Sequence, residues 1–158
     1  MSERYHTIPR TLCLVMHEGK LLLIEYAERK GAMHGFYNAL GGHIEAGEGI
    51  IESAKREILE EAGLRVRNTR LKGIAHVTNF FGKNVMMFVT QSETDSVEVT
   101  ESDEGKLHWV GLDELDQINL IGDIRTILEH VIENGEGGMF TSVNEFDGGG
   151  KLLKVTFE

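Results

Sequence analysis

The pattern of apolar and polar positions along the chain predicts short strands and two amphipathic helices. Apolar runs bounded by glycines or polar residues are typical of strands. By this criterion we expect strands at 10–16, 20–26, 36–40, 71–78, 84–90, 107–110, 139–144 and 151–157. The polar or glycine-containing segments 17–19, 81–83 and 147–150 predict tight connections, so we expect the chain to end in a β-hairpin.

Two segments instead show apolar residues at helical spacing. Residues 50–62 carry a stripe made by Ile51, Ala54, Ile58 and Ala62. Gly63 follows, where a left-handed cap would end the helix. Residues 123–133 have a second apolar face, and segments 28–35 and 43–49 are too polar and glycine-rich for either pattern. The pair Gly41–Gly42 predicts a turn after the third strand. Together these elements predict one mixed α/β (α+β) domain over residues 1–158.

Composition and charge argue against a membrane-spanning, secreted or nucleic-acid-binding protein. No apolar run approaches the roughly 20 residues of a membrane span, and residues 1–10 lack the apolar segment of a secretory signal. Cys13 is the single cysteine, which excludes an internal disulfide and fits a cytoplasmic protein. The net charge of -10 disfavours binding to a nucleic acid polymer. It permits a small phosphorylated ligand whose charge is met by divalent cations.

Three carboxylates are clustered on the first predicted helix. At 100° per residue, Glu57, Glu60 and Glu61 share a surface of roughly 100° beside the apolar stripe. Like charges at this spacing destabilise a helix by a few tenths of a kcal/mol. A solvated acidic face is one interpretation of the cluster. A site for Mg²⁺ or Mn²⁺ is the other, because these cations prefer oxygen ligands and would relieve the repulsion.

The residues around this cluster favour the metal site. The stretch from Gly42 to Leu64 has glycines before and after the carboxylates and an arginine beside them, at the spacing of a known signature. It resembles the Nudix hydrolase family at the positions Gly42, Glu48, Arg56, Glu57, Ile58, Glu60, Glu61, Gly63 and Leu64. The resemblance implies a mixed sheet sandwiched between helices.

The resemblance also implies roles for these residues. A backbone carbonyl at Gly42 would complete a metal site with Glu57 and Glu61, and Glu60 would contribute to it. Arg56 is expected to pair with Glu48 and so to tie the preceding loop to the helix, although a role in binding phosphate remains an alternative. Gly63 is expected to be structural.

The implied reaction is hydrolysis of a phosphoanhydride in a nucleoside diphosphate linked to another group. Such a reaction requires cations that neutralise phosphate oxygens, an in-line water and a group that accepts its proton. Within the motif Glu57 or Glu60 is a candidate base, and the metal ion itself is an alternative means of activating the water. Glu104, in the sequence ESDE shortly before Trp109, is a candidate from outside the motif.

Residues outside the motif indicate the substrate. The chain resembles oxidised purine nucleoside triphosphate diphosphatases in its Tyr37–Gly42 segment, its ESDE sequence and its C-terminal hairpin. By this resemblance Asn38 and Asp123 would contact a purine, but Ile124 stands where a second acidic residue is expected. Phe80 and Phe81 are candidates for an aromatic wall or for core packing.

Several alternatives stay open on the sequence. The chain is expected to bind a small nucleotide, and 8-oxo-dGTP, a dinucleoside polyphosphate and ADP-ribose are all candidate substrates. A nucleotide sensor without turnover is the alternative from another class of protein. The sequence leaves the oligomeric state open.

Overall fold

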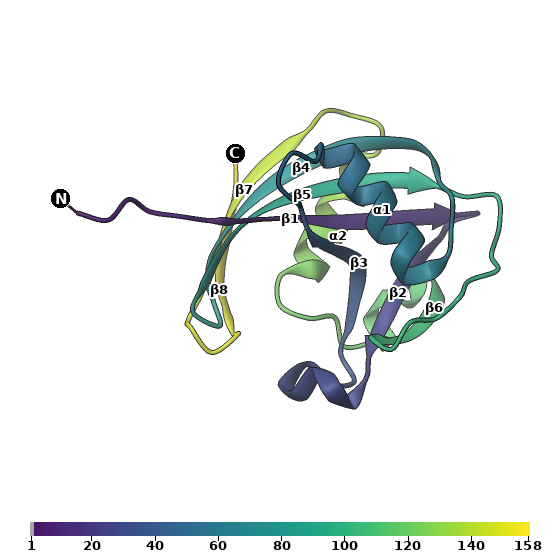
Figure 1. Cartoon of the computed structure of the whole chain (residues 1–158), viewed down its shortest axis with the longest axis horizontal. Helices are drawn as coiled ribbons and strands as arrows, with labels where there is room; N and C mark the ends of the chain where they lie inside the picture. The colour runs from purple at the N-terminus through teal and green to yellow at the C-terminus, as the bar shows by residue number, and fades with distance from the viewer. Residues whose placement is uncertain (1) are drawn as a thin grey trace.

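The computed structural model describes residues 2–158 and arranges them around an eight-stranded mixed sheet (Figure 1). The strands are β1 (Ile8–His17), β2 (Lys20–Tyr26), β3 (Tyr37–His43), β4 (Arg67–Phe80), β5 (Lys83–Glu93), β6 (Gly105–Gly111), β7 (Phe140–Phe146) and β8 (Leu152–Phe157). Their order is β6-β2-β3-β1-β5-β4-β7-β8. The β1–β5 and β4–β7 pairs are parallel and the other pairs are antiparallel.

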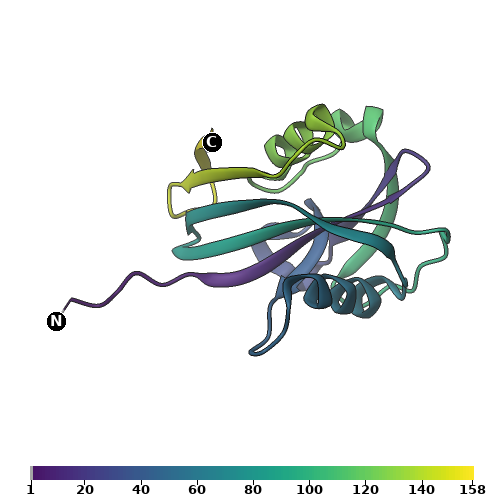
Figure 2. The same ribbon diagram turned by 90° about the horizontal axis from the view of Figure 1, so that it is seen from above.

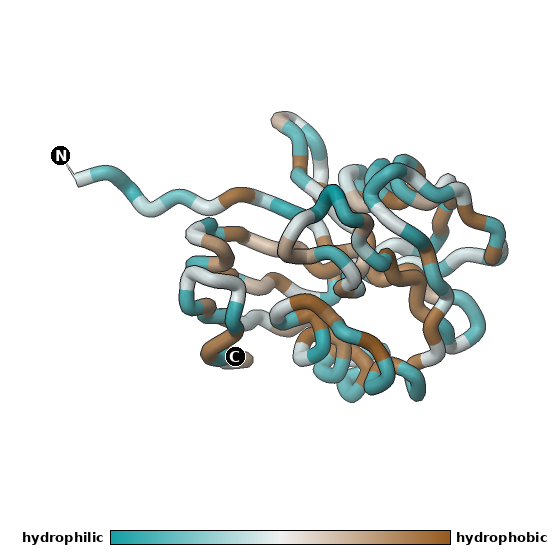
Figure 3. Tube along the Cα trace, turned by 90° about the horizontal axis from the view of Figure 1, so that it is seen from below, coloured by the Kyte–Doolittle hydropathy of each residue, from teal (hydrophilic) through white to brown (hydrophobic). Residues whose placement is uncertain are grey.

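The sheet lies between two helices, α1 (Ile50–Ala62) and α2 (Ile124–Asn134) (Figure 2). Successive residues of a strand point to opposite faces, so a continuous apolar run supplies two cores at once. In β1, Leu12 and Leu14 pack on the α2 side, whereas Cys13 and Val15 pack on the α1 side. In Figure 3, hydrophobic residues concentrate within the sheet and the extended N-terminal segment is mostly hydrophilic. The predicted fold class and the helices on both faces of the sheet are confirmed.

The first helix has the predicted bounds and the predicted end. Gly63 adopts φ 69° and ψ 15°, and its N–H donates to the Leu59 carbonyl at 2.9 Å. Ala54, Ile58 and Ala62 are fully buried, as the apolar stripe predicts. No helix in residues 2–158 is long and apolar enough to span a membrane.

The predicted turn at Gly41–Gly42 is wrong. Strand β3 continues through both glycines to His43, and they pair with Leu12 and Thr11 of β1. Gly41 has φ 153°, and a Cβ there would collide with the Thr11 carbonyl oxygen. The glycine is therefore required by the close approach of β1 and not by a turn.

Other differences concern the ends of elements. A 3₁₀ segment, η1 (Glu28–Met33), occupies the predicted loop, and a second, η2 (Leu112–Gln117), precedes α2. Strands β4 and β5 extend beyond the predicted ranges at both ends. The C-terminal hairpin is present, with β7 and β8 paired antiparallel.

Candidate active site

Carboxylates from α1 and from a distant loop line one cavity of about 310 Å³. Helix α1 supplies Glu57 and Glu61, and the loop before β6 supplies Glu104. The backbone of β3 forms the opposite wall at Gly41 and Gly42. We name this the carboxylate cavity.

Glu61 is the most buried of these acids. Its Oε2 accepts a hydrogen bond from the Gly41 N–H at 3.4 Å. Burial, followed by the negative charges of Glu104 and Glu57, raises the pKa of Glu61 to about 8. A buried carboxylate facing two others is a poor arrangement for stability alone, and a cation would relieve it.

Glu57 is held against the second glycine of β3. A Cβ on Gly42 would collide with the Glu57 carboxylate, so only glycine leaves room for this acid. Burial raises the pKa of Glu57, and the neighbouring Arg56 guanidinium opposes that shift. The Gly42 carbonyl accepts a hydrogen bond from the Thr11 hydroxyl at 3.5 Å.

Arg56 ties the loop before α1 to the helix. Its Nε and Nη2 donate to Glu48 at 2.6 and 2.9 Å, and Nη2 also donates to the His43 carbonyl at 3.0 Å. Its Nη1 donates to Glu57 at 3.0 Å. The hydrogen bonds from Arg56 lower the pKa of Glu48 to about 2. The expected Arg56–Glu48 pair is present, and these contacts occupy the guanidinium nitrogens that a phosphate would need.

Glu60 lies apart from the other acids of α1. Its side chain is 59% exposed, it accepts from Arg56 Nη1 at 3.2 Å, and it does not line the carboxylate cavity. Glu104 does line that cavity and pairs there with Lys30 at 3.4 Å. Within residues 2–158, no three His, Cys, Asp or Glu side chains converge on one point as a preformed metal site.

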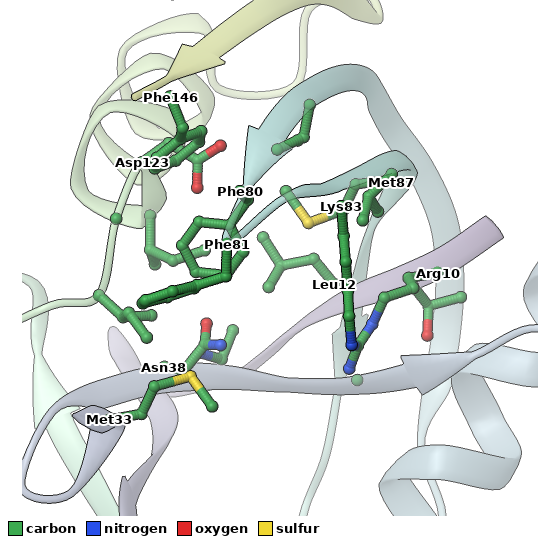
Figure 4. A pocket seen from close by; sticks show the side chains of 18 of the residues that line it. Arg10, Leu12, Met33, Asn38, Phe80, Phe81, Lys83, Met87, Asp123 and Phe146 are labelled. Carbon is green, nitrogen blue, oxygen red and sulfur yellow. The ribbon is translucent and has the colours of Figure 1, made fainter. Parts of the chain in front are cut away.

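A second cavity of about 350 Å³ adjoins the first and contains the four residues that the sequence proposed for substrate (Figure 4). They are Asn38, Phe80, Phe81 and Asp123. Phe80 packs edge to face against Phe81 and Phe146, with ring centroids 4.7 and 4.8 Å apart. Phe81 is 46% exposed and therefore forms part of the rim. We name this the base cavity.

Asn38 is oriented by its neighbours in the sheet. Its Oδ1 accepts from the Ala39 N–H at 2.8 Å, and its Nδ2 donates to the Tyr26 hydroxyl at 2.9 Å. Burial raises the pKa of Tyr26, so the hydroxyl stays protonated at neutral pH. Tyr26 lines both cavities, a position that no motif in the sequence predicts.

Asp123 is buried at the start of α2 without capping it. Its Oδ2 accepts a hydrogen bond from the Asn144 amide, whose Oδ1 in turn accepts from the Ser142 hydroxyl at 2.8 Å. Burial raises the pKa of Asp123, and the Asn144 bond opposes that shift. Ile124, the residue that departs from the expected acidic pair, is buried and also lines the base cavity.

The two cavities form one continuous site. Both are lined by Arg10, Tyr26, Lys30, Ala39 and Gly41. Sequence reasoning missed Arg10, Lys30 and Lys83, the last of which lines the base cavity. The available signal was strand alternation, which places Arg10 on the same face of β1 as the cavity residue Leu12.

Comparison with known proteins agrees with the motif and the fold. Residues 6–132 match the NUDIX domain family. The uncharacterized Nudix hydrolase YvcI of Bacillus subtilis is 31% identical over 146 residues, which cover 87% of this chain and 88% of the relative. The oxidized purine nucleoside triphosphate hydrolase of Mus musculus is 36% identical over 108 residues, which cover 66% of this chain and 67% of the relative.

A solved structure extends the likeness to the whole fold. The mMutator MutT protein from Bacillus halodurans superposes with a TM-score of 0.82 at 30% identity, covering 96% of this chain and 97% of that one. The family match covers most of the chain and includes helix α1 with its glutamates. The chain belongs to the Nudix hydrolase family.

Proposed function

We propose that this Nudix hydrolase cleaves a phosphoanhydride of a purine nucleoside triphosphate, releasing the nucleoside monophosphate and pyrophosphate. The observation that carries the proposal is the continuity of the two cavities, one aromatic and one rich in carboxylates. A nucleotide has the same two parts, an aromatic base and a chain of phosphates. Because the two cavities adjoin and share lining residues, one ligand is able to occupy both.

The base cavity has the chemistry of a purine site. Phe80 and Phe81 offer aromatic surface, which stacks on bases of any kind. The Asn38 amide faces the same space and is able to form paired hydrogen bonds with a purine edge. The buried carboxyl of Asp123 adds a polar group, and among residues 2–158 it accepts one side-chain hydrogen bond, from Asn144.

The carboxylate cavity suits Mg²⁺, with Mn²⁺ as the alternative. Its donors are oxygens, and burial, followed by repulsion from Glu104 and Glu57, raises the pKa of Glu61, a charge imbalance that a bound cation would offset. Glu57 and Glu61 would hold the cation together with the Gly42 carbonyl, and Glu60 would join them if its side chain left Arg56. When bound, the cation supplies positive charge to the phosphate oxygens.

The remaining chemistry falls to side chains of the same cavity. Glu57 and Glu104 line it from two different elements and are the candidates to accept a proton from the attacking water. Glu60 is the third candidate and, in this structure, lies on the exposed side of Arg56. Arg56 keeps Glu57 oriented by a hydrogen bond at 3.0 Å.

The choice of purine is supported by the mouse relative, whose name describes hydrolysis of oxidized purine nucleoside triphosphates. With Ile124 in place of a second acid, the site offers one fewer hydrogen-bonding group to an oxidised base. We therefore expect hydrolysis of both 8-oxo-dGTP and dGTP with a smaller preference for the oxidised base than two acids would give.

The test is a panel of substrates with and without Mg²⁺. The panel contains 8-oxo-dGTP, dGTP, dATP, dCTP, a dinucleoside polyphosphate and ADP-ribose, and the products are resolved by chromatography. The proposal expects Mg²⁺-dependent release of pyrophosphate, with purine triphosphates ahead of dCTP. Preferred cleavage of ADP-ribose or the dinucleotide would replace the proposed substrate. Tight binding of nucleotides with no turnover would identify a sensor instead.

A further inference from the structure

Two cationic side chains reach the base cavity without a carboxylate partner. Arg10 and Lys83 both line it, and among residues 2–158 neither forms a side-chain hydrogen bond or an ion pair. The other cations nearby are engaged: Arg56 binds Glu48 and Glu57, and Lys30 pairs with Glu104. In an acidic protein of net charge -10, two cations left free at one cavity indicate an anionic ligand.

The strand register brings these two side chains to the same face of the sheet. Arg10 lies opposite Met87 in the parallel β1–β5 pair. Lys83 is four residues earlier on β5, and alternation places Lys83, Val85 and Met87 on one face. Figure 4 shows Lys83 and Arg10 extending from β5 and β1 toward the same part of β3. Both side chains are long enough to approach one ligand group from two strands.

The position of Arg10 and Lys83 relative to the carboxylates indicates which part of a ligand they would bind. Arg10 lines both cavities, so it lies where a nucleotide would pass from the base cavity to Glu57 and Glu61. A chain of phosphates entering there is repelled by the carboxylates of the second cavity. The positive charges of Arg10 and Lys83 offset that repulsion, and a guanidinium is able to bind phosphate oxygens with two parallel hydrogen bonds.

We propose that Arg10 and Lys83 form a phosphate clamp that binds the phosphate chain where it leaves the base cavity, and that the clamp selects triphosphates over nucleotides with fewer phosphates. This inference rests on the proposed function for its substrate class. The clamp assigns a role to two residues outside the family motif. It also explains how the site would distinguish nucleotides by their number of phosphates. A longer chain presents more negative charge to the clamp, so its binding depends more strongly on both cations.

The first experiment measures binding without turnover. Inorganic tripolyphosphate, pyrophosphate and phosphate are titrated by calorimetry into the wild-type chain and into Arg10→Gln, Lys83→Gln and the double variant. Controls are Arg65→Gln and Lys20→Gln, which remove exposed cations that line neither cavity. Each clamp substitution is expected to weaken tripolyphosphate binding about tenfold, the size of one charged hydrogen bond. The controls are expected to bind as wild type does.

The second experiment measures kinetics with dGTP and dGDP. The clamp predicts that the KM for dGTP rises about tenfold in each variant and that kcat falls much less, because the lost contact is present in both ground and transition states. The KM for dGDP is expected to rise less. Lys83→Arg, which keeps the charge, is expected to restore most of the affinity. Thermal unfolding confirms that all variants are folded.

The two proposals fail in different ways. If wild type hydrolyses dGTP but the double variant keeps its KM and its affinity for tripolyphosphate, the clamp is rejected and the proposed function stands. If no nucleotide is hydrolysed but tripolyphosphate binding depends on Arg10 and Lys83, the proposed function is rejected and the anion site stands. Equal weakening by Arg65→Gln or Lys20→Gln would reject the clamp, because it would show a general effect of surface charge.

Discussion

Asp123 occupies the N-cap position of α2, yet its carboxylate accepts a hydrogen bond from Asn144 on β7 and makes no bond to the helix. Aspartate at this position usually accepts a backbone N–H of the first turn. Here the side chain is turned toward the sheet, where it lines the base cavity. The Asp123 side chain therefore leaves the helix uncapped and places a polar group in the wall of the base cavity.

The Asp123–Asn144 bond predicts a cost in stability when one partner is removed. Asn144→Leu leaves a buried carboxyl without its donor and is expected to lower the free energy of unfolding by about 1–3 kcal/mol. Urea denaturation followed by the fluorescence of Trp109 measures this change. The double variant Asp123→Leu with Asn144→Leu should recover part of the loss, because no polar group is then left unsatisfied. The exposed control Asn119→Leu is expected to change stability by less than about 0.5 kcal/mol.

Glu61→Gln tests the role of the carboxylate cavity. The amide keeps the shape and an acceptor for the Gly41 N–H but removes the negative charge, so we expect kcat to fall at least about 100-fold with an unchanged fold. Steady-state kinetics and circular dichroism measure the two effects. Glu52→Gln, an exposed position in the first turn of the same helix, is the matched control. Near-wild-type turnover of Glu61→Gln would remove Glu61 from the proposed cation site.

Asn38→Ala tests the contact with the base. Loss of the amide is expected to raise KM about tenfold for dGTP and much less for dCTP, because the amide, which donates one hydrogen bond and accepts one, is proposed to pair with the edge of a purine. Tyr26→Phe frees the Asn38 Nδ2 without removing the amide and should have a smaller effect. A rise of the same size for purine and pyrimidine substrates would show that Asn38 only supports β3.

The raised pKa of Glu61 predicts how the metal-free protein responds to pH. The pKa of Glu61 is about 8 in the folded chain, and its ordinary value of 4.5 applies to the unfolded chain. Between these two pH values Glu61 therefore binds more protons in the folded chain than in the unfolded chain. Stability from this group is therefore complete below about pH 4.5 and is lost as pH rises toward about 8. Thermal unfolding in a chelator should give a Tm difference between Glu61→Gln and wild type that grows over this window. Addition of Mg²⁺ at the upper end should remove that difference, and a pH-independent difference would contradict the shift.

The parts of the fold that local sequence determines were predicted well. The bounds of α1 follow from its apolar period and from Gly63, both of which are properties of neighbouring residues. Glycines at 41 and 42 look the same locally whether they form a turn or a tight strand contact. The distinction depends on Thr11 and Glu57, which lie far away in the chain, so the predicted turn was wrong.

The candidate site likewise contains residues that the sequence motif predicts and residues that only the fold brings together. The motif placed Glu57, Glu61 and Gly42, which the structure brings into one cavity. It did not predict that Arg56 holds Glu60 away from them, because helical rotation alone leaves side-chain direction open. Arg10, Tyr26 and Lys83 reach the cavities from three strands with no motif of their own, and only the strand register shows that they meet.

The C-terminal hairpin has a consequence for how substrate range changes. Strands β7 and β8 follow the segment that matches the family, yet Phe146 lines the base cavity and Asn144 holds Asp123. A Cβ at Gly150 would collide with the ring of Phe81, so the hairpin loop also packs against the rim. Under the proposed function, selectivity for the base would therefore depend partly on a segment that carries none of the acids of α1. Exchange of this hairpin between related enzymes would then be expected to change the base preference while α1 and its glutamates stay the same.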